Sequence, residues 1–191
     1  VIDSECKDVS SFVNETPAVP TEQTEAQKEA GNYKKGHIRL DGYKITIENQ
    51  KGSQRKGVDS DGKKWSITMN NTYGYIRETK GKDGDHIDIF LSDTPESGSV
   101  YVVDQLNKDG SFDEHKVMYG FDSEQEAREA YLSNYKEGWN GHGSITEVSK
   151  DTFKEWINSS KRKTKPFSEY KLVNEANNPI RFLDVNEYAQ E

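Results

Sequence analysis

The chain has 191 residues and a formal net charge of −8, and hydrophobic and charged residues each make up 31% of it. This acidic balance argues against sequence-independent nucleic-acid binding, because such binding relies on a basic surface whose lysine and arginine side chains neutralise phosphates. The single cysteine, Cys6, excludes an intramolecular disulfide and a cysteine-based zinc site. The sequence contains no apolar run of about 18 residues, so we expect no membrane partner.

The unusually polar average predicts a compact centre between polar ends. We expect a polar N-terminal tail at residues 1–20, one folded domain at residues 21–160 and a polar C-terminal extension at residues 161–191. Val1 stands where an initiator methionine would be, which favours a processed or excised piece of a longer chain, or a recombinant fragment.

Capping-box spacing followed by a glycine predicts a helix from Thr24 to Ala30. Apolar and polar residues then alternate in short segments separated by turn sequences such as Asp41-Gly42. We interpret these segments as strands at 38–40, 45–47, 65–69, 87–91, 100–103 and 112–119.

Helical signals come after the strands. Ser123 and Glu126 form a capping box, and Gly138 is the expected end of that helix. A last short helix is predicted around residues 153–157. Strands followed by helices predict an α+β fold that is mainly β and contains a small barrel or sandwich.

Three carboxylates, those of Asp83, Asp85 and Asp88, fall within six residues. Like charges this close raise one another's pKa unless water or a cation compensates them. Asp83 and Asp85 point the same way on an extended chain. Gly84 permits a turn that would bring the carboxylate of Asp88 close to them. The motif by itself leaves two interpretations open, a solvated acidic turn or a site for a hard divalent cation.

A second acidic cluster contains Asp109, Asp113 and Glu114, with Lys116 two residues further on. By itself it is typical of a solvated strand. Two acidic clusters in one small β domain, with cationic side chains near them in sequence, favour a site in which metal ions and lysine or arginine together hold phosphate. Arg55, Lys116 and Lys136 are the cationic candidates, and Tyr73 and Tyr135 are candidate phenol donors.

These residues resemble the signature of the soluble family I inorganic pyrophosphatases. The likeness begins with Tyr73-Gly74-Tyr75-Ile76 and continues with Asp83-Gly84-Asp85-x-Ile87-Asp88-Ile89. Glu114-x-Lys116 and Tyr135-Lys136 follow in the order that the family has. From Thr24 to about Ile157 the chain is more similar still to pyrophosphatase-like domains of phage and mobile-element polyproteins, a likeness carried by residues 31–37 and 112–118.

The resemblance implies an OB-like five-stranded barrel with flanking helices. It also implies Asp85 as the catalytic residue, which either acts as the general base or orients the attacking water. The implied metal ligands are Asp83, Asp88, Asp109, Glu114 or its neighbour Asp113, and Glu48 for an outer metal. The implied phosphate-binding residues are Arg55, Tyr73, Lys116, Tyr135 and Lys136.

The main functional hypothesis is hydrolysis of inorganic pyrophosphate to two phosphates with Mg²⁺, or with Mn²⁺ as a second candidate metal. Two alternatives stay open. One is a phosphohydrolase that acts on another small phosphoanhydride, and the other is a catalytically weak metal-binding module of a phage or mobile-element polyprotein whose tails bind protein partners. We expect a cytoplasmic protein, released from such a polyprotein if the closer likeness holds, with no nucleic-acid partner.

Overall fold

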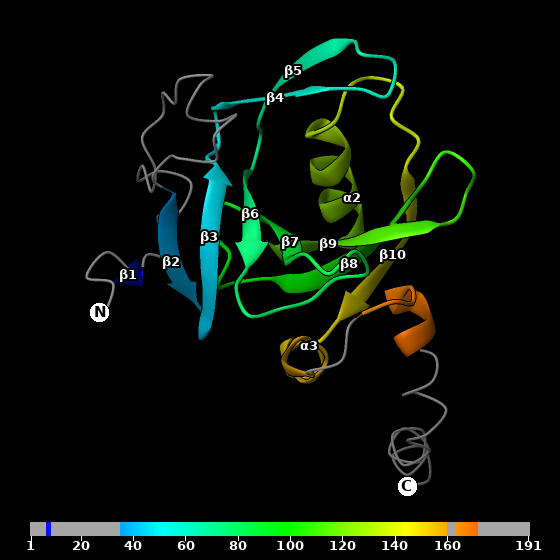
Figure 1. The fold of residues 1–191 in the computed structure, drawn as a ribbon. Coiled ribbons are helices and arrows are strands. Elements are labelled where there is room, and N and C mark those ends of the chain that lie inside the picture. Colours follow the sequence, from blue (N-terminus) through cyan, green and yellow to red (C-terminus); the bar gives the residue numbers. More distant parts are fainter. Residues whose placement is uncertain (1–6, 9–34, 160–162, 172–191) are drawn as a thin grey trace, which may run out of the picture.

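The computed structural model describes residues 7–8, 35–159 and 163–171 (Figure 1). The predicted helix from Thr24 to Ala30 and most of both polar ends lie outside these residues. The strands are β1 (Lys7–Asp8), β2 (Gly36–Leu40), β3 (Tyr43–Asn49), β4 (Gln54–Val58), β5 (Lys64–Thr68), β6 (Thr72–Ile76), β7 (Ile87–Leu91), β8 (Ser99–Leu106), β9 (Phe112–Phe121) and β10 (His142–Val148). The helices are α2 (Glu124–Ser133) and α3 (Lys150–Asn158), followed by a helical segment at residues 167–171.

One eight-stranded sheet has the order β1-β2-β3-β6-β7-β9-β8-β10, and β4 and β5 form a separate two-stranded sheet. The predicted α+β class, mainly β, is confirmed. Within the described residues β1 and β10 are the edges of the large sheet, so it is not closed and the predicted five-stranded barrel is not confirmed. No helix in the described ranges is long and apolar enough to cross a membrane.

Two local sequence signals have the predicted effect. Asp41 and Gly42 both have positive φ angles, 48° and 86°, as a type I′ turn requires, and they join β2 to β3. The side chain of Ser123 accepts a hydrogen bond from the backbone N–H of Glu126, which caps α2 as its spacing predicts.

The predicted end of this helix at Gly138 is wrong, because α2 ends at Ser133. Asn134 stops the helix. Its side-chain amide donates to the carbonyl of Ala130 at 2.8 Å and to Asn71 Oδ1 at 3.0 Å, which ties the end of α2 to the start of β6. Tyr135 and Lys136 therefore lie just after the helix and not on it.

Alternation along the central strands divides their side chains between two faces. On β9, Val117 and Tyr119 pack with α3, whereas Met118 packs with α2. Glu114 and Lys116 have the parity of Met118, so they lie on the α2 face. The same rule puts Asp88 of β7 on that face. Arg55 of the β4–β5 hairpin reaches this face as well, where it contacts Tyr73.

The segment 163–171 packs against the opposite face. Phe167 is fully buried among the residues that surround α3. The buried carboxylate of Asp104 accepts hydrogen bonds from the backbone N–H groups of Phe167 (2.6 Å) and Ser168 (3.1 Å) and from the hydroxyl of Ser144 (2.7 Å). This carboxylate therefore caps the helical segment that begins at Phe167.

His115 lies beside this contact. Its Nε2 is 3.0 Å from the carbonyl oxygen of Lys165, and its Nδ1 is buried without a hydrogen-bond partner among the described residues. Burial lowers the pKa of His115 from 6.5 to about 4, although the nearby Asp104 favours the charged form. At neutral pH the ring is therefore uncharged, and Nε2–H donates to Lys165.

Phe167→Ala is expected to lower the free energy of unfolding by about 3–5 kcal/mol, because it removes a fully buried aromatic ring and leaves a cavity. Denaturant unfolding of the full chain measures this change. Glu169→Ala, an exposed position in the same segment, is the control and is expected to change little. Equal stabilities for the two variants would contradict the docking of this segment.

The second prediction concerns His115 and pH. Because its folded pKa is below its unfolded value, the stability that it contributes is present above pH 6.5 and is lost as pH falls toward about 4, at a total of about 3 kcal/mol. Unfolding free energies measured across this range should fall more steeply for the parent than for His115→Gln. Parallel curves for the two proteins would show that the ring is not held neutral.

Candidate active site

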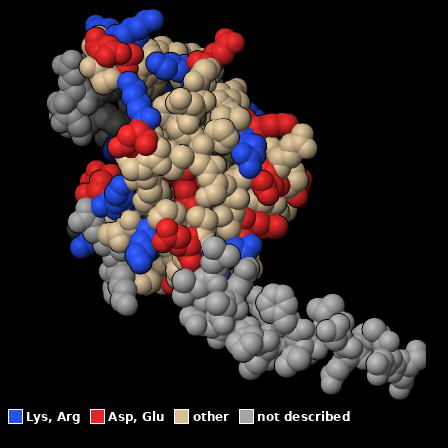
Figure 2. Space-filling model, turned by 90° about the vertical axis from the view of Figure 1, so that its right-hand side faces the viewer, with Lys and Arg blue, Asp and Glu red and all other residues tan. Residues whose placement is uncertain are grey.

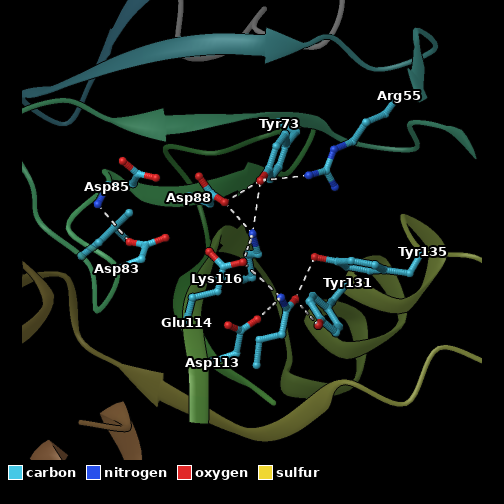
Figure 3. A network of polar contacts seen from close by, with 12 residues as sticks. Arg55, Tyr73, Asp83, Asp85, Asp88, Asp113, Glu114, Lys116, Tyr131 and Tyr135 are labelled. Carbon is cyan, nitrogen blue, oxygen red and sulfur yellow. Dashed lines mark hydrogen bonds and ion pairs between the residues drawn. The ribbon is translucent and has the colours of Figure 1, made fainter. Parts of the chain in front are cut away.

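Lys116 is the centre of the polar network on the α2 face (Figure 3). Its side chain is only 3% exposed. The ammonium lies 2.5 Å from Asp88 Oδ2, 2.9 Å from Glu114 Oε1 and 3.2 Å from the hydroxyl of Tyr73. Burial alone would lower the pKa of Lys116, but the surrounding tyrosines and carboxylates outweigh it and raise that pKa well above its usual value. Lys116 is therefore a fixed cation.

Strand pairing explains why these residues meet. β7 and β9 are parallel, and their register places Asp88 directly beside Lys116. β6 pairs with the other edge of β7, which brings Tyr73 to the same face. Gly74 has a packing role in this motif, because a Cβ at that position would lie 2.0 Å from the carbonyl oxygen of Thr46 on β3.

Tyr73 connects the buried lysine with Arg55 of β4. Its hydroxyl donates to Asp88 Oδ2 at 2.5 Å and accepts from Arg55 at 3.5 Å. The guanidinium of Arg55 also lies 4.5 Å from the centre of the Tyr73 ring, within the range of a cation–π contact. Burial raises the pKa of Tyr73 although the nearby Lys116 opposes this effect, so the phenol stays protonated.

Gln105 of β8 forms the other half of the network, and the sequence analysis missed it. Its amide nitrogen donates to Asp113 Oδ2 at 3.3 Å and to Glu114 Oε1 at 3.2 Å. Its amide oxygen accepts from the hydroxyls of Tyr131 at 2.7 Å and Tyr135 at 3.0 Å. The available signal was alternation, since Tyr101, Val103 and Gln105 share the parity of one strand face.

A register shift between β8 and β9 lets both acids reach Gln105. Gln105 pairs with Glu114, but the next residue, Leu106, pairs with Phe112, so Asp113 is the extra residue of a bulge. Glu114 also contacts Lys116, whereas Asp113 contacts Gln105. Burial raises the pKa of Glu114 even though Lys116 opposes this effect.

Asp83 and Asp85 are exposed on the loop beside Asp88 (Figure 3). The backbone N–H of Asp85 donates to Asp83 Oδ1 at 2.9 Å, which closes a tight turn. Within the described ranges, no three or more Asp, Glu, His or Cys side chains are grouped closely enough to hold a metal ion.

Three predicted site residues make contacts outside this network. Glu48 forms an ion pair with Lys35 at 3.1 Å. Asp109 lies in the β8–β9 turn, where its carboxylate accepts from the hydroxyl and the backbone N–H of Ser111.

The third, Lys136, is exposed and lies 3.9 Å from Asp59 in the β4–β5 turn. The structure thus brings Arg55, Tyr73, Asp88, Asp113, Glu114, Lys116 and Tyr135 into one network. Asp83 and Asp85 lie on the loop beside Asp88, and Glu48, Asp109 and Lys136 make other contacts.

Comparison with protein families places this site in context. The model of the family described as Inorganic Pyrophosphatase (InPase) matches residues 25–158, more than half of the chain. The chain belongs to the inorganic pyrophosphatase family. Comparisons with curated proteins and with solved structures find no significant match. The match includes every strand of this inorganic pyrophosphatase domain from β2 to β10, and both α2 and α3.

Replacement of the fixed cation should destabilise this pyrophosphatase domain. Lys116→Met leaves Asp88 and Glu114 as partly buried like charges, so we expect a loss of about 3–5 kcal/mol in unfolding free energy. Lys136→Met removes an exposed lysine and is the matched control, with an expected change of less than about 1 kcal/mol. A similar small change in both variants would mean that Lys116 does not compensate the two acids.

Proposed function

We propose that the protein hydrolyses inorganic pyrophosphate to two phosphates with a divalent cation, Mg²⁺ or Mn²⁺. The observation that carries the proposal is a buried lysine flanked by carboxylates and, through Tyr73, by Arg55, in a chain of the inorganic pyrophosphatase family. Lysine and arginine supply positive charge for phosphate oxygens, and carboxylates supply ligands for a cation.

Charge on the surface supports a site of this kind rather than a broad basic surface. Figure 2 shows acidic and basic side chains interspersed over the described part of one face. Recognition of a small polyanion would therefore depend on the few cations in the network, chiefly Arg55 and Lys116. A metal ion beside the carboxylates would add the remaining positive charge.

The donor set fits such a metal. Asp83, Asp88 and Glu114, with Asp113 beside Glu114, offer carboxylate oxygens only, which suit Mg²⁺ and Mn²⁺. We propose these residues as ligands, with Asp109 as a further ligand and Glu48 as a ligand of an outer metal. When bound, the metal would lower the pKa of a coordinated water and polarise the phosphate.

Asp85 is the proposed general base. It is an exposed carboxylate three residues from Asp88, on the loop that faces the network. It would accept one proton from the attacking water as the new P–O bond forms. The bond from that phosphorus to the bridging oxygen would break, and the bridging oxygen would leave with its electron pair on the second phosphate.

The remaining polar residues would hold the two phosphates. Lys116 and Arg55 would neutralise the charge that develops on the leaving phosphate. Tyr73 and Tyr135 would donate hydrogen bonds to the phosphates once their hydroxyl hydrogens turn from Asp88 and Gln105. Lys136 would approach from the turn after α2. Protein binding by the tails, a cytoplasmic location and release from a polyprotein are predictions from the sequence alone.

Phosphate release from pyrophosphate tests this function. We expect release with Mg²⁺ and none with EDTA, and Asp85→Asn should lower the rate about 10²–10⁴-fold, because an amide cannot accept the proton. Asp93→Asn, an exposed acid that pairs with Lys51, is the control and should keep the parent rate.

A parent rate in Asp85→Asn would contradict the role of that residue. Release from nucleoside triphosphates but not from pyrophosphate would replace the proposed substrate with another phosphoanhydride. No release from either compound would overturn the proposed function as a whole.

A further inference from the structure

Gln105 uses its complete hydrogen-bonding capacity inside the network. Its amide has two N–H donors and two acceptor lone pairs on oxygen. The donors face Asp113 and Glu114, and the acceptor faces Tyr131 and Tyr135, at distances between 2.7 and 3.3 Å. The residue is only 5% exposed, so water does not replace these contacts easily.

The orientation of the amide is set by charge. If the amide were reversed, its oxygen would face the carboxylates of Asp113 and Glu114, and like partial charges would repel. Gln105 thus joins two parts of the site that come from different elements. The carboxylates belong to β9, and the tyrosines belong to α2 and the turn after it.

This geometry decides where the hydrogen of Tyr135 points. A phenol has one O–H hydrogen, and in Tyr135 it is directed to Gln105 Oε1 at 3.0 Å. Tyr135 can donate to a phosphate only by rotating that hydrogen away from Gln105. Burial raises the pKa of Tyr135 to about 12, so the hydrogen stays on the oxygen at neutral pH.

Tyr131 keeps Gln105 satisfied during that exchange. It is buried, and its hydroxyl donates to the same Gln105 oxygen at 2.7 Å. Trp139 contacts both tyrosines. Its ring nitrogen donates to the hydroxyl of Tyr131 at 3.0 Å, and its ring stacks on that of Tyr135 with 4.7 Å between the ring centres. Tyr131 is therefore the donor that remains when Tyr135 turns to a ligand.

We propose that Gln105 and Tyr131 are positioning residues that hold Tyr135 ready to transfer its hydrogen bond from Gln105 to a phosphate oxygen. The inference rests on the proposed function in its choice of ligand. It assigns the two residues a role in phosphate binding although Tyr135 is the one that would contact the ligand.

Binding of inorganic phosphate, measured by calorimetry on the full chain with Mg²⁺ present, tests the proposal without any need for turnover. Tyr131→Phe should weaken phosphate binding about 10-fold, because transfer of the Tyr135 hydrogen then leaves the buried Gln105 oxygen without a donor. Gln105→Met should weaken it by a similar factor, because it removes the acceptor that orients the hydroxyl of Tyr135.

A double-mutant cycle separates this role from general damage to the fold. In a Tyr135→Phe background, Tyr131→Phe should have no further effect on phosphate binding, because the hydrogen to be transferred is already gone. Tyr101→Phe removes a hydroxyl from the same face of β8 and is the control, with phosphate affinity equal to that of the parent. Thermal unfolding of each variant checks that it is folded.

Two outcomes would overturn the proposal. One is parent affinity for phosphate in a folded Tyr131→Phe protein, and the other is a Tyr131→Phe effect that is the same with and without Tyr135. If the parent binds phosphate and the cycle behaves as expected but pyrophosphate is not hydrolysed, only the proposed function fails.

Discussion

The buried ammonium of Lys116 is the charge on which the arrangement of the site depends. It lies between Asp88 and Glu114, which project from neighbouring strands into partly buried surroundings. Without a cation between them, desolvation and mutual repulsion would favour protonation of one acid or separation of the strands' side chains. The pairing of β7 with β9 fixes this cation in place, so Tyr73 and Arg55 are arranged around a charge that the chain itself supplies.

On β8 and β9, residues that are adjacent in sequence make contacts on opposite faces of the sheet. Gln105 faces α2, whereas its neighbour Asp104 holds the segment 163–171 on the other face. On β9, His115 faces the same segment, and the residues on either side of it face the network. Adjacent residues on one backbone therefore contact the docked segment and the network from opposite faces. The C-terminal segment thus packs on the strands that carry the network, although the family match ends before it.

Sequence analysis could predict the parts of this site that depend on local pattern. Alternation places Glu114 and Lys116 on one face of a strand. The order of the motifs predicts that Asp88 belongs to the same site. Sequence analysis could not predict Gln105, because that role depends on a register shift between two strands and on a helix from elsewhere in the chain. Motif order alone assigned Lys136 to phosphate, but in the structure Lys136 lies 3.9 Å from Asp59 in the turn of the separate β4–β5 hairpin. Non-local pairing is the information that a single sequence lacks.

The three acids of the first motif, Asp83, Asp85 and Asp88, fall within six residues but have different surroundings. The backbone N–H of Gly81 donates to the carbonyl of Asp85 at 2.7 Å, and this closed loop keeps Asp83 and Asp85 exposed while Asp88 enters β7. Asp88 is compensated by Lys116, but the two exposed acids face water and would repel an incoming polyanion. On the proposed function, a divalent cation at these acids reverses the sign of the local field. Phosphate binding and metal binding should therefore favour each other, since the same exposed charges that oppose the free polyanion attract the cation that accompanies it.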